Sequence, residues 1–203
     1  IGVDAVNSAT YISFSIMTVA EDNGDSQMGW EMGLSHFAKD VDETKIGQDA
    51  AKKAVSMLGS KTIQNIRCPV VIENIIACEF LEIIAPSFYA DNLSKGKSML
   101  KGKKGNKVFS QNITLWDDGI LPDGWGTLEF DGEGIVGQKT CLIDKGIFID
   151  SLYDTYWAKR DRVSSTGNAI RSNFKSVSNI GITNLYIKQG TLNMDGLLKN
   201  MDK

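Results

Sequence analysis

The sequence predicts an α+β protein in which antiparallel, hairpin-rich sheets are accompanied by grouped helices in two subdomains. Stretches that alternate between apolar and polar side chains occur in pairs separated by short turns, which is typical of antiparallel hairpins. Stretches with helical spacing of apolar residues lie between these pairs and do not alternate regularly with single strands. A doubly wound parallel sheet is therefore not expected.

The first hairpin is predicted near the N-terminus. Residues 10–20 alternate, and residues 27–34 alternate again. Between them, Asn23-Gly24 tolerates the positive φ angles of a tight type I′ turn. The half-buried face of the first strand is expected to carry Ile12, Phe14 and Ile16.

A helix and a linker follow this hairpin. An apolar stripe at helical spacing predicts a helix over residues 46–58, and Gly59 is placed to end it. Residues 60–68 are polar and mixed, as expected of a link between subdomains. We therefore expect residues 1–60 to form the end of an N-terminal α+β region and residues 61–203 to form most of a C-terminal β-rich region.

The C-terminal region opens with an apolar segment. Residues 69–72 predict a short buried strand, and residues 75–85 predict a helix that Pro86 stops or kinks. Glu79 and Glu82 lie three residues apart and so share a face of this helix. Contact of that face with solvent or a partner subunit is the simpler explanation, and a general base is the alternative.

The rest of the chain predicts mainly strands. Strands are expected over residues 112–116, 127–130, 138–143, 147–152 and 183–188. The turn Asp144-Lys145-Gly146 joins two of them into a second hairpin. Further helices are expected over residues 153–161 and from Asn193 onward.

The composition argues against several classes of protein. A net charge of -3 and a pI near 5.2 do not suit a dedicated nucleic-acid binder. No apolar run approaches the roughly 18 residues that a membrane helix needs, so a soluble protein without membrane contact is expected. The three cysteines form no CxxC pair and have apolar neighbours, which suggests buried free thiols in a reducing cytoplasm.

Two glycine-rich stretches resemble nucleotide-binding motifs without meeting their requirements. Residues 132–137 match G-x-G-x-x-G but lead into a predicted strand, whereas the dinucleotide motif opens a helix. The lysine-rich residues 91–107 lack the spacing of a phosphate-binding P-loop. Chance turn glycines and a solvated connector explain the two stretches better.

The single histidine limits the chemistry that this chain can perform. His36 follows the first hairpin and has no nearby carboxylate or cysteine in the sequence. Zinc hydrolases use two or three imidazoles, and nucleophilic triads place a histidine beside an activated Ser or Cys. We therefore expect no catalytic residue and no metal ligand in this chain.

Several motifs in a fixed order resemble a known family. They are residues 21–25, 46–48, 69–71, 130–134, the hairpin 140–153, and residues 156–160, 165–169 and 184–186. Taken in order over nearly the whole chain, they resemble the TldD/PmbA family. Its members were once labelled modulators of DNA gyrase and are understood as peptide-processing metalloproteases. Because family members are much longer and this chain opens at Ile1, a processed or truncated piece is expected.

The resemblance implies two paired types of subunit. One type carries HExxxH on the helix after the Pro-Val-Val segment and binds zinc, and the PmbA (TldE) type lacks that motif. The matching stretch here places Leu81 and Pro86 at the two histidine positions and keeps only the glutamate, Glu82. A glutamate without a metal cannot activate water in the usual way. The resemblance thus implies a metal-free cytoplasmic subunit, with zinc only in a partner.

The implied partners are a TldD-like catalytic subunit or a second copy of this chain, together with a peptide substrate. By resemblance, Ser165-Thr166-Gly167-Asn168 forms a tight loop near the peptide or the subunit interface. One alternative is a binding protein that modulates DNA gyrase or another nucleic-acid complex, supported only by the lysines of residues 91–107. Another is a self-sufficient hydrolase that uses Glu79 or Glu82.

Overall fold

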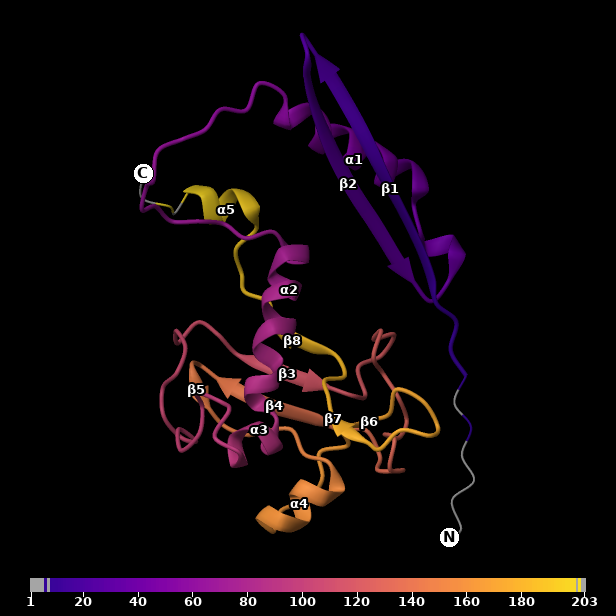
Figure 1. Cartoon of the computed structure of the whole chain (residues 1–203), viewed down its shortest axis with the longest axis vertical. Coiled ribbons are helices and arrows are strands. Elements are labelled where there is room, and N and C mark those ends of the chain that lie inside the picture. Colours follow the sequence, from indigo (N-terminus) through magenta and orange to yellow (C-terminus); the bar gives the residue numbers. More distant parts are fainter. Residues whose placement is uncertain (1–5, 7, 200, 202–203) are drawn as a thin grey trace. The chain divides into compact units, whose positions relative to one another are not determined.

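The computed structural model describes residue 6, residues 8–199 and residue 201. The chain divides into two compact units, one formed by Ser8–Cys68 and the other mainly by Pro69–Lys203. The described residues form five α-helices and three antiparallel sheets (Figure 1). The predicted α+β class is confirmed.

The first unit is built on the predicted hairpin. Strand β1 (Ile12–Asp22) pairs antiparallel with strand β2 (Asp25–Ser35) along their whole length. The turn residues Asn23 and Gly24 have φ angles of 48° and 85°, as a type I′ turn requires. A short 3₁₀ turn, η1 (Ala38–Asp40), leads to helix α1 (Glu43–Met57), whose first turn is capped by the side chain of Asp42.

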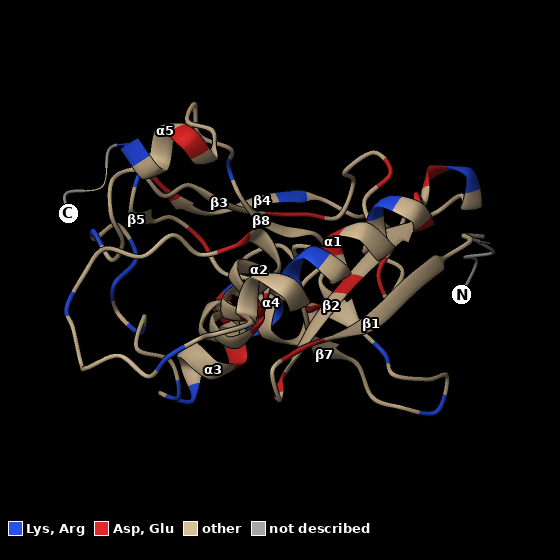
Figure 2. Cartoon of the chain, turned by 90° about the horizontal axis from the view of Figure 1, so that it is seen from above, with Lys and Arg blue, Asp and Glu red and all other residues tan. Residues whose placement is uncertain are grey.

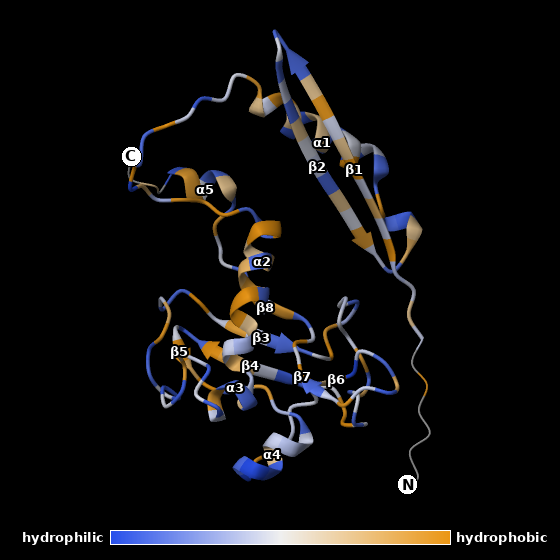
Figure 3. Ribbon diagram, viewed as in Figure 1, coloured by the Kyte–Doolittle hydropathy of each residue, from blue (hydrophilic) through white to orange (hydrophobic). Residues whose placement is uncertain are grey.

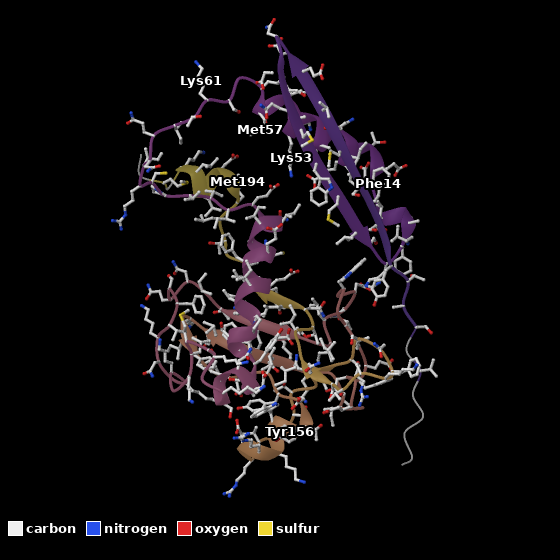
Figure 4. All side chains as sticks on the ribbon, viewed as in Figure 1. Phe14, Lys53, Met57, Lys61, Tyr156 and Met194 are labelled. Carbon is white, nitrogen blue, oxygen red and sulfur yellow. The ribbon has the colours of Figure 1, made fainter. Side chains whose placement is uncertain are left out.

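Helix α1 packs closely on one face of this hairpin. A β-carbon on Gly29 would lie 2.1 Å from the carbonyl oxygen of Ala50, so only glycine permits this contact. Ile46, Ala50 and Ala54 form the buried stripe of the helix. Lys53 Nζ also forms an ion pair with Glu31 Oε2 at 2.9 Å. Figure 4 labels Lys53.

The opposite face of the hairpin carries large apolar side chains that are exposed within this unit. Because side chains alternate along each strand, the face away from α1 carries apolar residues from both strands. The exposed members are Met17, Val19, Met28, Trp30 and Leu34.

The second unit opens with helix α2 (Asn74–Ile84), followed by the 3₁₀ turn η2 (Ala85–Phe88) and the short helix α3 (Ala90–Ser94). The helix ends before Pro86, as predicted. The buried strand expected at residues 69–72 is wrong, because this segment pairs with no described strand and Val70 is 77% exposed. An apolar segment that no other segment of its unit packs against remains exposed, even where its residues favour a β-strand.

A four-stranded antiparallel sheet forms the centre of the second unit. Its order is β5 (Ile147–Phe148), β4 (Lys139–Asp144), β3 (Leu115–Asp118) and β8 (Leu185–Ile187). The hairpin of β4 and β5 turns at Lys145 and Gly146, which have φ angles of 46° and 83°. The strand expected at residues 127–130 is wrong, because that segment makes only the single bridge Phe130 to Val136.

The core of this unit gathers side chains from η2, β3, β4 and β5. Its most buried large side chains are Phe88, Leu115, Leu142, Phe148 and Leu152. Helix α4 (Thr155–Asp161), the two-stranded sheet β6 (Ala169–Ile170) with β7 (Asn179–Ile180), and helix α5 (Met194–Lys199) complete the unit. Helix α4 begins at the capping side chain of Asp154, which accepts a hydrogen bond from the Trp157 N–H.

The cysteines differ from the expectation of burial. All three are free thiols, but Cys68 and Cys78 are exposed and Cys141 is half-buried. Cys78 is exposed although it lies one turn before Leu81, the buried residue of α2, so a position on this side of the helix does not ensure burial. Within the part of the chain that the structure describes, no helix has the length and apolar character needed to cross a bilayer.

Candidate functional site

Helix α2, to which the resemblance assigns the zinc motif, presents no set of metal ligands among its described residues. Leu81 is buried in the hydrophobic core, whereas Glu82 is exposed. Pro86 is exposed in the first turn of η2, where its ring nitrogen has no hydrogen to donate. Leucine and proline side chains offer no atom that binds zinc, so one carboxylate remains where a site needs three or four ligands. The residues present do not fit the metal.

The remaining candidates for metal chemistry do not supply the missing ligands. Glu79 is exposed like Glu82. His36 belongs to the other unit, where its Nδ1 lies 2.8 Å from the carbonyl oxygen of Thr10 and its ring lies 5.2 Å from that of Tyr11. Over the described residues, no three His, Cys, Asp or Glu side chains converge as they would around a metal ion.

The loop Ser165-Thr166-Gly167-Asn168 is held tightly in place. The Thr166 N–H donates a hydrogen bond to the Tyr153 carbonyl oxygen at 3.2 Å. The Tyr153 N–H in turn donates to Thr166 Oγ1 at 2.8 Å. The Thr166 hydroxyl donates to Asn168 Oδ1 at 2.6 Å. Gly167 has a φ angle of 72°, the left-handed conformation that glycine adopts most readily. The loop is therefore a rigid turn beside the start of α4.

Asn168 anchors this loop to the central sheet. Its Nδ2 donates to Asp117 Oδ2 at 2.7 Å and to the carbonyl oxygen of Gly181 at 2.9 Å. Thr183 donates to Asp117 as well, from its N–H at 2.8 Å and its hydroxyl at 2.9 Å. Burial raises the pKa of Asp117, and the hydrogen bonds from Asn168 and Thr183 oppose that shift.

A second buried carboxylate, Asp131, fixes the turn that faces the loop. Its Oδ1 accepts hydrogen bonds of 2.9 Å from the N–H groups of Glu133 and Ile135. Its Oδ2 accepts a hydrogen bond of 3.0 Å from the N–H of Ala169. Asp131 thus joins residues 131–135 to the first residue of β6.

Glu133 adds a further link from this turn. Its Oε2 accepts a hydrogen bond of 2.8 Å from the N–H of Thr155, the first residue of α4, and its Oε1 accepts one of 2.7 Å from Ser178. Burial raises its pKa, but these hydrogen bonds outweigh burial and leave the pKa of Glu133 below its usual value. A carboxylate at a helix N-terminus also interacts favourably with the helix dipole.

These segments surround a cavity of about 370 Å³. Five of its lining residues are glycines, namely Gly119, Gly126, Gly132, Gly137 and Gly167. Its large apolar side chains are Leu128, Phe130, Ile170 and Ile182. The only charged residues that line it are Asp131 and Arg171. The structure therefore places Gly167 at a cavity and Asn168 in the network behind it, while Leu81, Glu82 and Pro86 line no part of that cavity.

Sequence reasoning missed Asp117, Asp131 and the cavity. A signal for Asp117 was present, because two carboxylates end an otherwise apolar strand. A second signal was the density of glycines over residues 119–137. The G-x-G-x-x-G stretch leads into strand β4, as predicted. Its first and last glycines, however, line the cavity.

The lysine-rich connector is partly neutralised. Lys95 pairs with Asp91 at 2.9 Å, and Lys104 pairs with Asp150 at 2.8 Å. The segment begins within α3 and ends before β3, and Figure 2 shows Lys and Arg positions in blue beside α3. It makes no contribution to the lining of the cavity.

The chain consists of a hairpin-and-helix unit and an antiparallel-sheet unit, and each matches a domain of one metallopeptidase-like family. Residues 2–58 match the family model of the PmbA/TldA metallopeptidase central domain, and residues 65–203 match that of its C-terminal domain. The chain belongs to the PmbA/TldD family.

Similar proteins match most of this chain. An uncharacterized protein of Methanocaldococcus jannaschii is 32% identical over 200 residues, which cover 96% of this chain and 45% of that protein. A metalloprotease PmbA homolog of Buchnera aphidicola subsp. Baizongia pistaciae is 31% identical, over 83% of this chain and 38% of its own. The structure of TldE from Thermococcus kodakarensis superposes with a TM-score of 0.83 at 25% identity, over 95% and 44% of the two chains. The chain thus spans less than half the length of these relatives.

Proposed function

We propose that this chain is part of a metal-free, PmbA (TldE)-type subunit that supports peptide processing by a TldD-type zinc metalloprotease. The observation that carries the proposal is the chemistry of α2. Leu81 and Pro86 stand where the family's zinc motif has its histidines, and Leu81 is packed into the core. The zinc and the water-activating glutamate then belong to the partner subunit, and this subunit has no catalytic activity of its own.

The exposed apolar surface of α2 supports a role in assembly. Ile76, Phe80 and Ile83 are 42%, 54% and 75% exposed, and Figure 3 shows that much of this helix is apolar. Contiguous exposed apolar surface is typical of a site that another protein covers. A TldD-type subunit or a second copy of this chain is the partner that we propose, within the cytoplasm.

The test is to purify the full-length parent protein alone and together with a TldD-type subunit. Zinc per chain is measured by mass spectrometry, and hydrolysis of an unfolded peptide is measured in both samples. We expect zinc and hydrolysis only when the TldD-type subunit is present. One tightly bound zinc per chain in the parent protein alone would contradict the proposal.

A matched pair of variants separates the proposal from a self-sufficient hydrolase. Glu82→Gln in this chain removes the only glutamate that aligns with the zinc motif, and Glu79→Gln is its control on the same exposed helix. We expect the assembled complex to keep its rate of hydrolysis with either variant. Loss of hydrolysis with Glu82→Gln alone would instead assign the general base to this chain.

A second candidate function is modulation of DNA gyrase or another nucleic-acid complex. The lysine-rich connector favours it, although Lys95 and Lys104 are paired with carboxylates. Binding of this kind weakens steeply with salt, because phosphate contacts release counterions. DNA affinity that falls with salt and is lost on neutralising Lys101, Lys103 and Lys107 would support this function, whereas no binding at low salt would eliminate it.

A further inference from the structure

Glycine main chain forms part of the walls of the cavity beside the Ser165-Asn168 loop. A β-carbon on Gly126 would lie 2.5 Å from the carbonyl oxygen of Thr183, and one on Gly137 would lie 2.7 Å from that of Leu128. A β-carbon on Gly132 would lie 2.9 Å from the carbonyl oxygen of Ala169. Glycines thus let backbone segments from distant parts of the sequence meet and enclose a space without filling it with their own side chains.

The polar side chains around this cavity are already engaged. Asp131 accepts three backbone hydrogen bonds, shared between its two oxygens. The hydroxyl of Thr183 donates to Asp117. Arg171 donates from Nε to the carbonyl oxygen of Gly132 at 2.8 Å and from Nη1 to that of Ser176 at 3.1 Å. The surface that the cavity presents to a ligand is therefore mainly apolar.

The apolar part of the lining is accessible at the surface. Leu128 is 41% exposed and Ile170 is 44% exposed, and both line the cavity together with Phe130 and Ile182. A volume of about 370 Å³ lies at the small end of the range of roughly 300–1,000 Å³ that ligand sites occupy. The space has room for a bulky side chain and is too small for a folded element.

We propose that this cavity binds one bulky apolar side chain, such as leucine or phenylalanine, of an unfolded peptide. The inference rests on the proposed function, from which the peptide character of the ligand follows. The lining contains one cation and one anion, Arg171 and Asp131, so it gives a charged side chain no net attraction. A charged side chain would lose its hydration without gaining a partner, whereas an apolar side chain gains by burial.

The cavity also explains how a subunit without a metal can contribute to peptide processing. Extended peptides present their side chains alternately on two sides, and pockets for those side chains give such binding its selectivity. A pocket in this subunit can hold the peptide while the chemistry takes place in the partner. The pocket then distinguishes unfolded from folded substrates, because unfolded chains expose apolar side chains that folded proteins bury.

The test uses the full-length parent protein without its partner and capped peptides of the form Gly-Gly-Xaa-Gly-Gly. Binding is measured by isothermal titration with leucine, phenylalanine, aspartate or lysine at the central position. We expect the leucine and phenylalanine peptides to bind at least about tenfold more tightly than the charged ones, as pockets that sort side chains by polarity do. Equal affinity for all four, or no binding of the apolar peptides, would overturn the proposal.

Two variants connect this binding to the cavity. Leu128→Trp adds bulk at an exposed lining position and is expected to weaken binding of the leucine peptide at least about tenfold. Leu192→Trp, at an exposed leucine outside the lining, is the control and should bind as the unchanged protein does. If Leu128→Trp does not fold, Ile170→Ala enlarges the cavity and should shift preference from leucine toward phenylalanine.

The outcomes separate this inference from the proposed function. Zinc content and association with a TldD-type subunit report the role of the subunit and do not depend on the cavity. A protein that associates without zinc but binds all four peptides equally keeps its proposed function and loses the cavity site. Unchanged binding by a folded Leu128→Trp, together with unchanged preference in Ile170→Ala, would likewise remove the cavity from peptide recognition.

Discussion

Asn168 donates a 2.7 Å hydrogen bond from its Nδ2 to Oδ2 of Asp117, which lies 51 positions earlier in the chain. Both side chains are almost completely buried, with exposed fractions of 2% and 1%. The bond ties the loop at residues 165–168 to the central strand β3. The position of the loop therefore depends on a buried polar contact as well as on its own turn geometry.

Removal of the Asn168 amide should destabilise the second unit. Asn168→Ala leaves the buried Asp117 with one donor fewer, and we expect the free energy of unfolding to fall by about 3 kcal/mol. The control is Asn112→Ala, at an exposed asparagine, which should change it by less than about 0.5 kcal/mol. Urea denaturation followed by fluorescence measures both, and equal effects would show that the buried contact adds nothing.

Asp117 should make stability depend on pH in the acidic range. Because burial raises its pKa in the folded protein, the folded state keeps this proton to a higher pH than the unfolded chain does. Its contribution is therefore favourable at low pH. Stability falls as pH rises from the ordinary aspartate pKa of about 3.9 through the raised pKa of the folded state.

The Asp117→Asn variant isolates this contribution, because asparagine does not titrate. Urea midpoints of the two proteins are compared from about pH 3 to about pH 7. This range starts below the ordinary aspartate pKa of about 3.9 and extends upward in the direction in which folding raises the pKa of Asp117. We expect the stability of the unchanged protein to decline relative to the variant as pH rises. Parallel curves would mean that the pKa of Asp117 is the same in the folded and unfolded states.

Gly29 should be irreplaceable in the first unit. An alanine β-carbon there would lie 2.1 Å from the Ala50 carbonyl oxygen and 2.5 Å from the Ala54 nitrogen, both of which belong to the helix backbone. We expect Gly29→Ala to lower the free energy of unfolding by about 3 kcal/mol, because α1 must move away from β2.

The control for Gly29 is a glycine within α1. Gly47 has open space around its β-carbon position, so Gly47→Ala should raise stability by about 0.5–1 kcal/mol through reduced backbone entropy. Thermal unfolding followed by circular dichroism compares the two variants. A Gly29→Ala protein as stable as Gly47→Ala would refute the close contact between helix and hairpin.

Alanine variants at Gly167 and Gly134 distinguish the cost of backbone strain from the cost of steric crowding. Both have positive φ angles, 72° and 80°, so alanine should cost about 1 kcal/mol at either position. At Gly167 the β-carbon would also lie 2.8 Å from the Val136 carbonyl oxygen, whereas Gly134 is open. We expect Gly167→Ala to lose about 1–2 kcal/mol more than Gly134→Ala in urea denaturation. Equal losses would show that the loop adjusts freely beside the cavity.

The local structure of this chain was predictable wherever neighbouring residues decide it. The hairpin of β1 and β2, its Asn23-Gly24 turn, and the end of α2 before Pro86 all follow from side-chain periodicity and backbone preference. The same reasoning failed for residues 69–72 and for the burial of Cys68 and Cys78. Their exposure depends on which segments pack against them, and an apolar composition does not specify those segments.

The sequence by itself determined that this chain carries one histidine, and it predicted the hairpin of β1 and β2 with its Asn23-Gly24 turn. Only the tertiary structure brought Asp117 to Asn168 and Asp131 to Ala169, and only it enclosed a cavity between glycines from separate loops. The physical reason is the range of the interactions. Periodicity and turn chemistry act over a few residues, whereas these contacts join groups 38 and 51 positions apart, which become neighbours only once the sheet has formed.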